Sequence, residues 1–321
     1  MRYAQPAWLP GPHLPTLWPL LRKPALPPFQ RERWETPDGD FIDLDWLPAI
    51  PGKPLVVLFH GLEGSSRSHY ARSVMAAARA RGWNGVVPHF RGCSGEPNRL
   101  ARAYHSGDSD EIDWILARCQ VRAQGAPLFA SGVSLGGNAL LKWLGERGAR
   151  AGETIAGAVA ICPPLDLAIS GHALARGFNR VYTQHFLATL KAKAEDKLQR
   201  GLGRFDIARI RRANTLYAFD DAYTGPLHGF DGADDYWRRA SARPWLAHVR
   251  APAVLLLADN DPFVPAAAWP APDLGESTLQ VRILRGGGHV GFTSGGFPGH
   301  QSWLGQQVID ACSVMGKFDI T

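Results

Sequence analysis

Cysteine is scarce in this sequence, and its spacing argues against two common uses. No two of the cysteines form a C-x-x-C pair, so neither a structural zinc site nor a disulfide framework is expected. We therefore predict reduced, mostly buried thiols and a protein that needs no metal or other cofactor. The four residues concerned are Cys93, Cys119, Cys162 and Cys312.

The sequence also lacks a long apolar run, of about 20 residues, that could cross a membrane. Segment 8–26 is interrupted by Pro10, Pro12, Pro15 and Pro19, and so does not resemble the apolar core of a signal peptide. We therefore expect a cytoplasmic protein.

Runs of like charge are absent as well. The formal net charge is +6, yet the basic residues are spread along the chain without a basic run. This pattern favours a solvated, mildly basic surface and no nucleic-acid partner, while peripheral contact with a lipid surface stays open. The sequence contains no pattern that indicates the oligomeric state. The apolar fraction of 45% over 321 residues is ample for a large buried core.

The most informative pattern that is present is GVSLG at residues 132–136, between an apolar run and a helix-forming segment. A serine hydroxyl is a weak nucleophile, so a hydrolase holds it at a sharp strand-to-helix turn where a base can reach it. Gly132 and Gly136 would allow two backbone segments to approach closely there. We predict that Ser134 is a nucleophile, although five residues alone are only a moderately specific signal.

The partners of such a serine follow in the chain order that an α/β-hydrolase requires: serine, acid, histidine. Apolar segment 253–258 leads into Asp261, which places a carboxylate just beyond the end of a predicted strand. A second predicted strand, 279–284, is followed by glycines and then His289. We predict that His289 is the general base, carried over Ser134 by a flexible loop, and that Asp261 orients it.

Two other carboxylates compete with Asp261. Asp166 also follows a predicted strand, but an aspartate beside a helix start is more often an N-cap. Asp259 lies two residues before Asp261 and is assigned to a turn. From the sequence, Asp166 stays open as a second candidate for the acid.

Segment 55–59 is an apolar run that ends in a His60-Gly61 loop. In an α/β-hydrolase, one oxyanion donor is the backbone N–H after the nucleophile, and the other comes from a loop of this kind. We predict that these donors are the N–H groups of Leu135 and Leu62. His60 is expected to hold the loop in place rather than act as a base.

With these motifs the sequence resembles the α/β-hydrolase superfamily, and within it the YheT-like esterases related to ABHD1, ABHD3 and EMB8. The resemblance covers nearly the whole chain and implies carboxylic-ester hydrolysis by Ser134, Asp261 and His289. Trp237 is one departure from the pattern, and it concerns the insert rather than the catalytic residues. The motifs that carry the resemblance are HGLEGS at 60–65, RGCSG at 91–95, YHSGD at 104–108, GVSLGGN at 132–138, FDD at 219–221 and DYWRRASA at 235–242.

Strands and helices alternate, which predicts an α/β fold with a mainly parallel eight-stranded sheet and helices on both faces. The stretch 163–245 is too long for a structureless connection, and it is rich in helix-forming and aromatic residues. We predict that it is a helical cap inserted after the sixth strand, and that 1–162 and 246–321 form the core. Strands are expected at 33–35, 41–47, 55–59, 85–90, 128–132, 156–161, 253–258 and 279–284, and helices at 70–81, 108–118, 135–145 and 299–315.

These observations predict a metal-free serine carboxylesterase that hydrolyses short- to medium-chain acyl esters, small-molecule substrates, through an acyl-enzyme. A lipase, thioesterase or acyltransferase would use the same groups, and all remain open. A non-catalytic binding module on the same fold is the alternative from another class.

Overall fold

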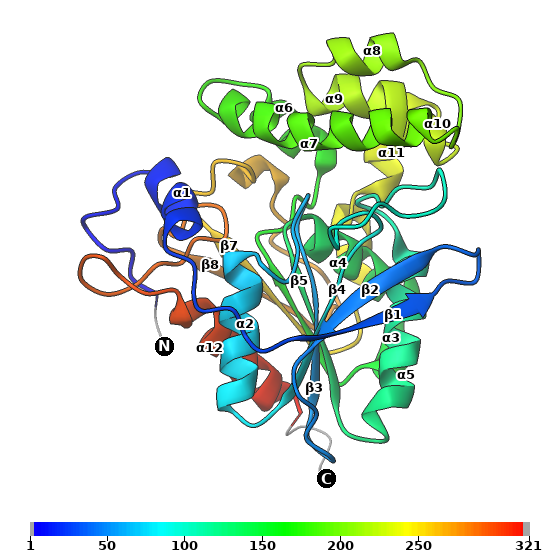
Figure 1. Cartoon of the computed structure of the whole chain (residues 1–321). Coiled ribbons are helices and arrows are strands. Elements are labelled where there is room, and N and C mark those ends of the chain that lie inside the picture. The colour runs from blue at the N-terminus through cyan, green and yellow to red at the C-terminus, as the bar shows by residue number, and fades with distance from the viewer. Residues whose placement is uncertain (1–2, 317–321) are drawn as a thin grey trace.

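The computed structural model describes residues 3–316 and is built around one twisted sheet (Figure 1). Its eight strands lie in the order β1-β2-β4-β3-β5-β6-β7-β8; β2 is antiparallel to both of its neighbours, and the pairs from β4 to β8 are parallel. The mainly parallel eight-stranded sheet is therefore confirmed. The strands are β1 (Gln30–Glu35), β2 (Phe41–Trp46), β3 (Leu55–Phe59), β4 (Asn84–Pro88), β5 (Leu128–Val133), β6 (Gly157–Ile161), β7 (Ala253–Ala258) and β8 (Leu279–Leu284).

The central strands are buried on both faces, and β3 shows why its sequence is continuously apolar. Leu55 and Val57 belong to the core on one side of the sheet, whereas Val56 and Leu58 belong to the core on the other. Successive side chains of a strand point to opposite faces, so a strand covered on both sides needs apolar residues at every position.

Two helices cover each face of the sheet. Helices α3 (Ser109–Ala123) and α4 (Leu135–Arg147) pack on the face that contains Leu55 and Val57. Helices α2 (His69–Ala80) and α12 (Ser302–Met315) pack on the face that contains Val56 and Leu58. α12 begins three residues later than predicted, because Ser294 and His300 form an isolated β-bridge just before it. Short helices η1 (Gly148–Arg150), α5 (Ala151–Thr154), η3 (Arg243–His248) and η4 (Ala266–Ala268) complete the core.

The segment between β6 and β7 forms a layer of helices above the carboxyl ends of the strands (Figure 1). It has an apolar cluster of its own, which includes Leu187, Ile210 and Phe219. The predicted helical insertion after the sixth strand is thus present. Its elements are α6 (Leu167–Leu174), α7 (Asn179–Gln199), α8 (Ile207–Arg212), α9 (Leu216–Phe219), η2 (Asp220–Thr224), α10 (Gly225–Leu227) and α11 (Gly232–Ala240).

Helix α1 (His13–Leu21) lies outside the predicted helices, because it contains Pro15 and Pro19. Pro15 lies in the first turn, where a backbone N–H has no intrahelical acceptor, so it costs no hydrogen bond there. Pro19 is only two residues from the end of the helix. α1 lies beside the gap between the sheet and the insert (Figure 1), and so reaches the carboxyl edge of the sheet.

Candidate active site

Ser134 lies at the turn between β5 and α4 with a φ of 51° and a ψ of −118°, a conformation that L residues rarely adopt. The flanking glycines make this turn possible. A Cβ at Gly132 would lie 2.5 Å from the carbonyl oxygen of Gly136, and a Cβ at Gly136 would lie 2.5 Å from the carbonyl oxygen of His60. The close approach expected from the sequence is therefore present, and the strained turn presents the hydroxyl to the cavity.

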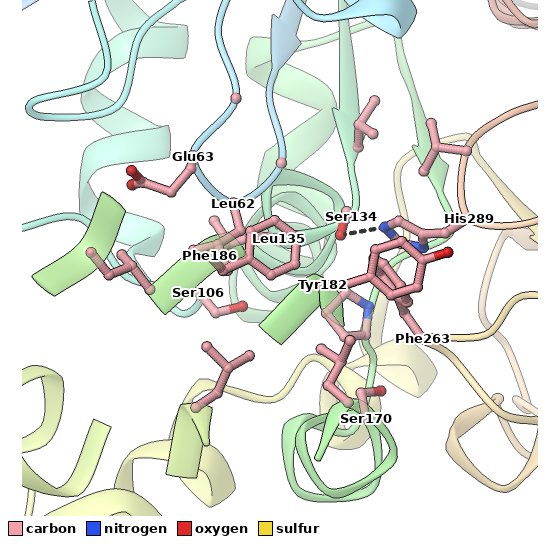
Figure 2. Close-up of a pocket in the computed structure, with 18 of the residues that line it drawn as sticks. Leu62, Glu63, Ser106, Ser134, Leu135, Ser170, Tyr182, Phe186, Phe263 and His289 are labelled. Atoms are coloured by element: carbon pink, nitrogen blue, oxygen red, sulfur yellow. Dashed lines mark hydrogen bonds between the residues drawn. The ribbon is translucent and has the colours of Figure 1, made fainter. Parts of the chain in front are cut away.

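The three predicted side chains meet at the carboxyl edge of the sheet. The Nε2 atom of His289 is 3.0 Å from Ser134 Oγ (Figure 2). Its Nδ1 atom is 2.9 Å from Asp261 Oδ2. The second carboxylate oxygen of Asp261 accepts from the backbone N–H groups of Phe263 at 2.7 Å and Val264 at 3.2 Å. The ring of Phe263 packs against the imidazole, with centroids 4.2 Å apart. Asp261 and His289 are therefore fixed in position by several contacts.

The loop that carries His289 is held more tightly than its glycines suggested. The backbone N–H of His289 donates to Thr16 Oγ1 at 2.8 Å, and Gly288 N–H donates to Asn260 Oδ1 at 2.8 Å. Asp259, assigned to a turn from the sequence, accepts from Gly286 N–H at 2.7 Å. No local sequence pattern indicates Thr16, because it lies on α1, 273 residues before His289. Asn260 carries no such signal either, because its partner Gly288 belongs to a different loop, 28 residues further on.

The competing acid lies elsewhere. Asp166 is the N-cap of α6: its Oδ1 accepts from the Ile169 N–H at 3.0 Å, and its other oxygen is 3.5 Å from an Arg243 nitrogen. The structure thus gives Asp166 a capping contact and brings Asp261 to His289.

The predicted oxyanion donors also lie together. Leu62 and Leu135 both line the cavity that contains Ser134. Leu135 is the first residue of α4, so its N–H has no intrahelical acceptor, and the N–H of Leu62 has no acceptor among residues 3–316. Gly61 lets this loop pass against the serine turn, since a Cβ there would lie 3.3 Å from Ser134 Cβ.

Buried side chains fix the loop that carries Leu62. His60 Nδ1 is 2.8 Å from the carbonyl oxygen of Gly61, and its Nε2 accepts from the Phe90 N–H at 3.0 Å. Burial lowers the pKa of His60 to about 3, so the ring stays neutral and serves both partners. Tyr70 accepts from the Gly61 N–H at 2.9 Å. His60 thus holds the loop, as expected from the sequence.

Glu63, the next residue, ties the same loop to the insert. Its side chain accepts from the hydroxyl of Tyr104 at 2.7 Å and from Lys193 Nζ at 2.7 Å. Lys193 belongs to α7, so an ion pair joins the oxyanion loop to a helix of the insert. No local sequence pattern indicates this pair, because its two residues are 130 positions apart in the chain.

A cavity of about 460 Å³ extends from Ser134 between the sheet and the insert. This volume lies within the range of about 300–1,000 Å³ that is typical of small-molecule sites. Leucine and aromatic side chains dominate its walls, and Figure 2 shows several of them around the serine. Apolar residues of the cavity include Leu20, Leu62, Leu135, Leu174, Tyr182, Phe186, Leu216, Phe219 and Phe263.

One buried carboxyl group lines the same cavity. Asp220, the first residue of η2, accepts from the indole N–H of Trp237 at 2.8 Å. Burial raises the pKa of Asp220 to about 6, because the charged form is poorly solvated there. Within residues 3–316, no cluster of three or more His, Cys, Asp or Glu side chains is placed to bind a metal ion, and no helix is long and apolar enough to cross a membrane.

The raised pKa of Asp220 gives a prediction for stability. The folded protein holds this proton up to about pH 6, whereas the unfolded chain releases it near 3.8, so stability falls as the pH rises through this window. Asp220→Asn keeps a hydrogen-bond acceptor and cannot ionise. We expect its free energy of unfolding, relative to wild type, to increase by about 2 kcal/mol between about pH 4 and pH 8. Urea unfolding at both pH values measures this, with the exposed Asp231→Asn as the control that should show no such change.

Comparison with known proteins places the chain in a family. Residues 54–295 match the alpha/beta hydrolase fold family, and the chain belongs to it. YheT of Escherichia coli K12, which is named as a candidate esterase, is 40% identical over 305 residues, spanning 93% of this chain and 89% of YheT. The mouse phospholipase ABHD3 is 27% identical over 89% of this chain and 74% of its own. The predicted membership of the group that contains YheT and ABHD3 is thereby confirmed.

Solved structures agree on the fold. The esterase Pf2001 of Pyrococcus furiosus superimposes with a TM-score of 0.55 over 90% of both chains, at 17% sequence identity. At this identity the likeness concerns the architecture and not the substrate.

Proposed function

We propose that this protein is a serine carboxylesterase in which Ser134, His289 and Asp261 form the catalytic triad. The observation that carries the proposal is the placement of the imidazole, 3.0 Å from the serine oxygen and 2.9 Å from the carboxylate. A relative at 40% identity is named as a candidate esterase, and this supports the choice of esters as substrates. The apolar cavity beside Ser134 suits an acyl chain.

In the proposed reaction, Ser134 Oγ attacks the ester carbonyl carbon while its proton passes to Nε2 of His289. The carbonyl oxygen becomes an oxyanion and accepts from the N–H groups of Leu62 and Leu135. As this tetrahedral intermediate collapses, the C–O bond to the alcohol breaks and His289 returns the proton to the leaving oxygen. A water molecule then repeats the sequence on the acyl-enzyme and releases the carboxylic acid. Asp261 stabilises the imidazolium throughout.

We propose that residues 163–245 act as the cap of this site. α7 and its neighbours roof the cavity, so they would exclude water and set the length of acyl chain that fits. The volume of about 460 Å³ favours short- to medium-chain esters.

Labelling with a fluorophosphonate probe tests the proposed nucleophile. We expect one adduct at Ser134 by intact-protein and peptide mass spectrometry, together with turnover of p-nitrophenyl esters from acetate to palmitate. A folded protein that forms no adduct and turns over none of these esters would favour the non-catalytic binding module.

Phe186 offers a test of the proposed acyl pocket. It extends from α7 and lines the cavity with Leu62 and Leu135, as Figure 2 shows. We expect Phe186→Ala to raise kcat/KM for long esters relative to acetate by about tenfold, because the added space accepts further methylenes, each worth about 0.8 kcal/mol. The control is Phe205→Ala, which removes a ring from the insert outside the cavity. An equal chain-length profile in both variants would contradict the proposed pocket.

A further inference from the structure

The surface around α1, which reaches the cavity through Leu20 and Lys23, exposes large apolar side chains. Leu21 at the end of α1 is 76% exposed, and Phe297 is 74% exposed. Soluble surfaces seldom gather such residues in one place without a partner. We call this region the mouth face; its exposed apolar residues are Leu14, Leu20, Leu21, Phe178, Val181 and Phe297.

Contacts across α1 hold these residues in one region. The ring centroids of His13 and Phe178, which precedes α7, are 4.5 Å apart, and those of Trp18 and Phe297 are 5.8 Å apart. In Figure 1, α1 lies beside the insert at the same edge of the sheet. The mouth face therefore spans α1, the start of α7 and the 295–298 loop.

The exposed Phe297 is presented by a fixed loop. The indole N–H groups of Trp8 and Trp18 donate to the carbonyl oxygens of Gly295 at 3.1 Å and Pro298 at 3.0 Å, on either side of the phenylalanine. Trp8 also packs against Phe297 at 5.4 Å. Tryptophans beside outward-pointing apolar residues suit the headgroup region of a bilayer.

The charge of the mouth face is mainly positive. Segments 1–31, 167–194 and 277–309, which supply this face, contain no Asp or Glu. Asp310, the next residue, lines a hollow with Leu21, Arg22 and Lys23, and its carboxylate lies 3.8 Å from Arg81. Exposed cations surround the apolar residues, and within the described part of the chain none of them forms an ion pair with an acidic side chain. They are Arg22, Lys23, Arg67, Arg176 and Arg180.

The mouth face also leads to the serine. Leu20, Lys23 and Arg67 line the same cavity as Ser134. A molecule that enters from this face would pass Lys23 and Arg67 before it meets the apolar walls.

We infer that the mouth face docks on an anionic lipid bilayer, with the apolar side chains inserted at the headgroup level and the cations on lipid phosphates. Clustered cations that form no ion pair within residues 3–316, set around exposed leucine and phenylalanine, match such a surface in charge and in polarity. Docking places the cavity opening against the lipid. Delivery of a lipid ester to Ser134 rests on the proposed function, whereas docking does not depend on it.

Sedimentation with vesicles tests the docking, using the full chain with Ser134→Ala so that lipid is not consumed. We expect binding to vesicles of phosphatidylcholine mixed with phosphatidylglycerol, weaker binding to phosphatidylcholine alone, and loss of binding at high salt. Arg22→Gln with Arg180→Gln should weaken binding about 25-fold, since each cation near the surface contributes about fivefold. Leu21→Gln with Val181→Gln should weaken it by about tenfold or more.

The matched control is Arg150→Gln with Arg204→Gln, which removes the same charge from exposed positions at the base of the core and beyond the far end of α7. We expect it to change binding less than about twofold. An effect equal to that of the Arg22 and Arg180 pair would overturn the inference, because binding would then follow net charge alone. An absence of binding to both kinds of vesicle would also overturn the inference. The same holds if light scattering shows a dimer that Leu21→Gln with Val181→Gln converts to a monomer, while the protein binds no vesicle.

Hydrolysis of a water-soluble ester separates the two proposals. With Ser134 present, each of these variants should hydrolyse p-nitrophenyl acetate at the wild-type rate. Vesicle binding without any hydrolysis would support docking and contradict the proposed esterase activity. Hydrolysis without vesicle binding would support the esterase activity and contradict docking.

Discussion

Ser134→Ala is expected to lower ester turnover by about a million-fold, as loss of the nucleophile does in other serine hydrolases. The missing oxygen is the atom that bonds to the acyl group, so no acyl-enzyme can form. The oxyanion donors are backbone N–H groups and remain in the variant. Residual activity above the uncatalysed rate should therefore persist at a low level. Burst kinetics with p-nitrophenyl butyrate measure the loss of the acyl-enzyme, and steady-state turnover of the same ester measures the residual activity.

The loss has to be separated from unfolding. The backbone at residue 134 adopts a φ of 51°, and its N–H donates to the Ile161 carbonyl oxygen at 2.8 Å. Both atoms of this bond belong to the backbone, so the substitution does not remove it. Alanine carries a Cβ as serine does, so the thermal midpoint should shift by no more than a few degrees. Turnover close to wild type in this variant would show that Ser134 is not the nucleophile.

Much of this architecture could be predicted because its signals are local. The apolar run and glycines around Ser134 predict β5, the turn and α4, and the same is true of the strand that ends before Asp261. Carboxyl ends of parallel strands meet at one edge of a sheet, so local patterns far apart in sequence converge on one place. The order of the three residues fits both Asp261 and Asp166, and only the contact of Asp261 with His289 separates the two acids.

Other features could not be predicted, because they depend on contacts between distant segments. Thr16 holds the backbone of His289 only because α1 folds against that loop, and the prolines of α1 weakened its helical signal. The ion pair of Glu63 and Lys193 likewise joins the core to the insert. Its partners are 130 residues apart, and each alone looks like an ordinary surface charge.

The insert illustrates the same limit at larger scale. Its helical character follows from composition, but the way α7 roofs the cavity depends on interactions such as that of Lys197, whose ammonium donates to the carbonyl oxygens of Leu100, Ala101 and Arg102 at 2.7–3.0 Å. These carbonyls belong to a loop of the core. A side chain that satisfies three backbone acceptors fixes the height of α7 above the sheet, and no periodicity in the sequence encodes it.

Asp261→Asn is expected to lower kcat by about ten-thousand-fold, while Asp166→Asn changes it less than about threefold. In the wild-type protein, the carboxylate accepts from Nδ1 of His289 and leaves Nε2 free to take the serine proton. The amide of an asparagine can donate to Nδ1 instead, which favours the tautomer that carries its proton on Nε2. That imidazole cannot accept from Ser134, although every atom of the site remains close to its original position.

The pair of variants distinguishes the two acids by chemistry and not by folding. Asparagine at 261 still accepts from the Phe263 and Val264 N–H groups, and asparagine at 166 still caps α6. Both proteins should therefore unfold near the wild-type temperature, so the difference in kcat reports on the imidazole alone. If Asp166→Asn proved the more damaging change, the partner of His289 during turnover would have to come from α6, and the loop after β7 would lose its proposed role.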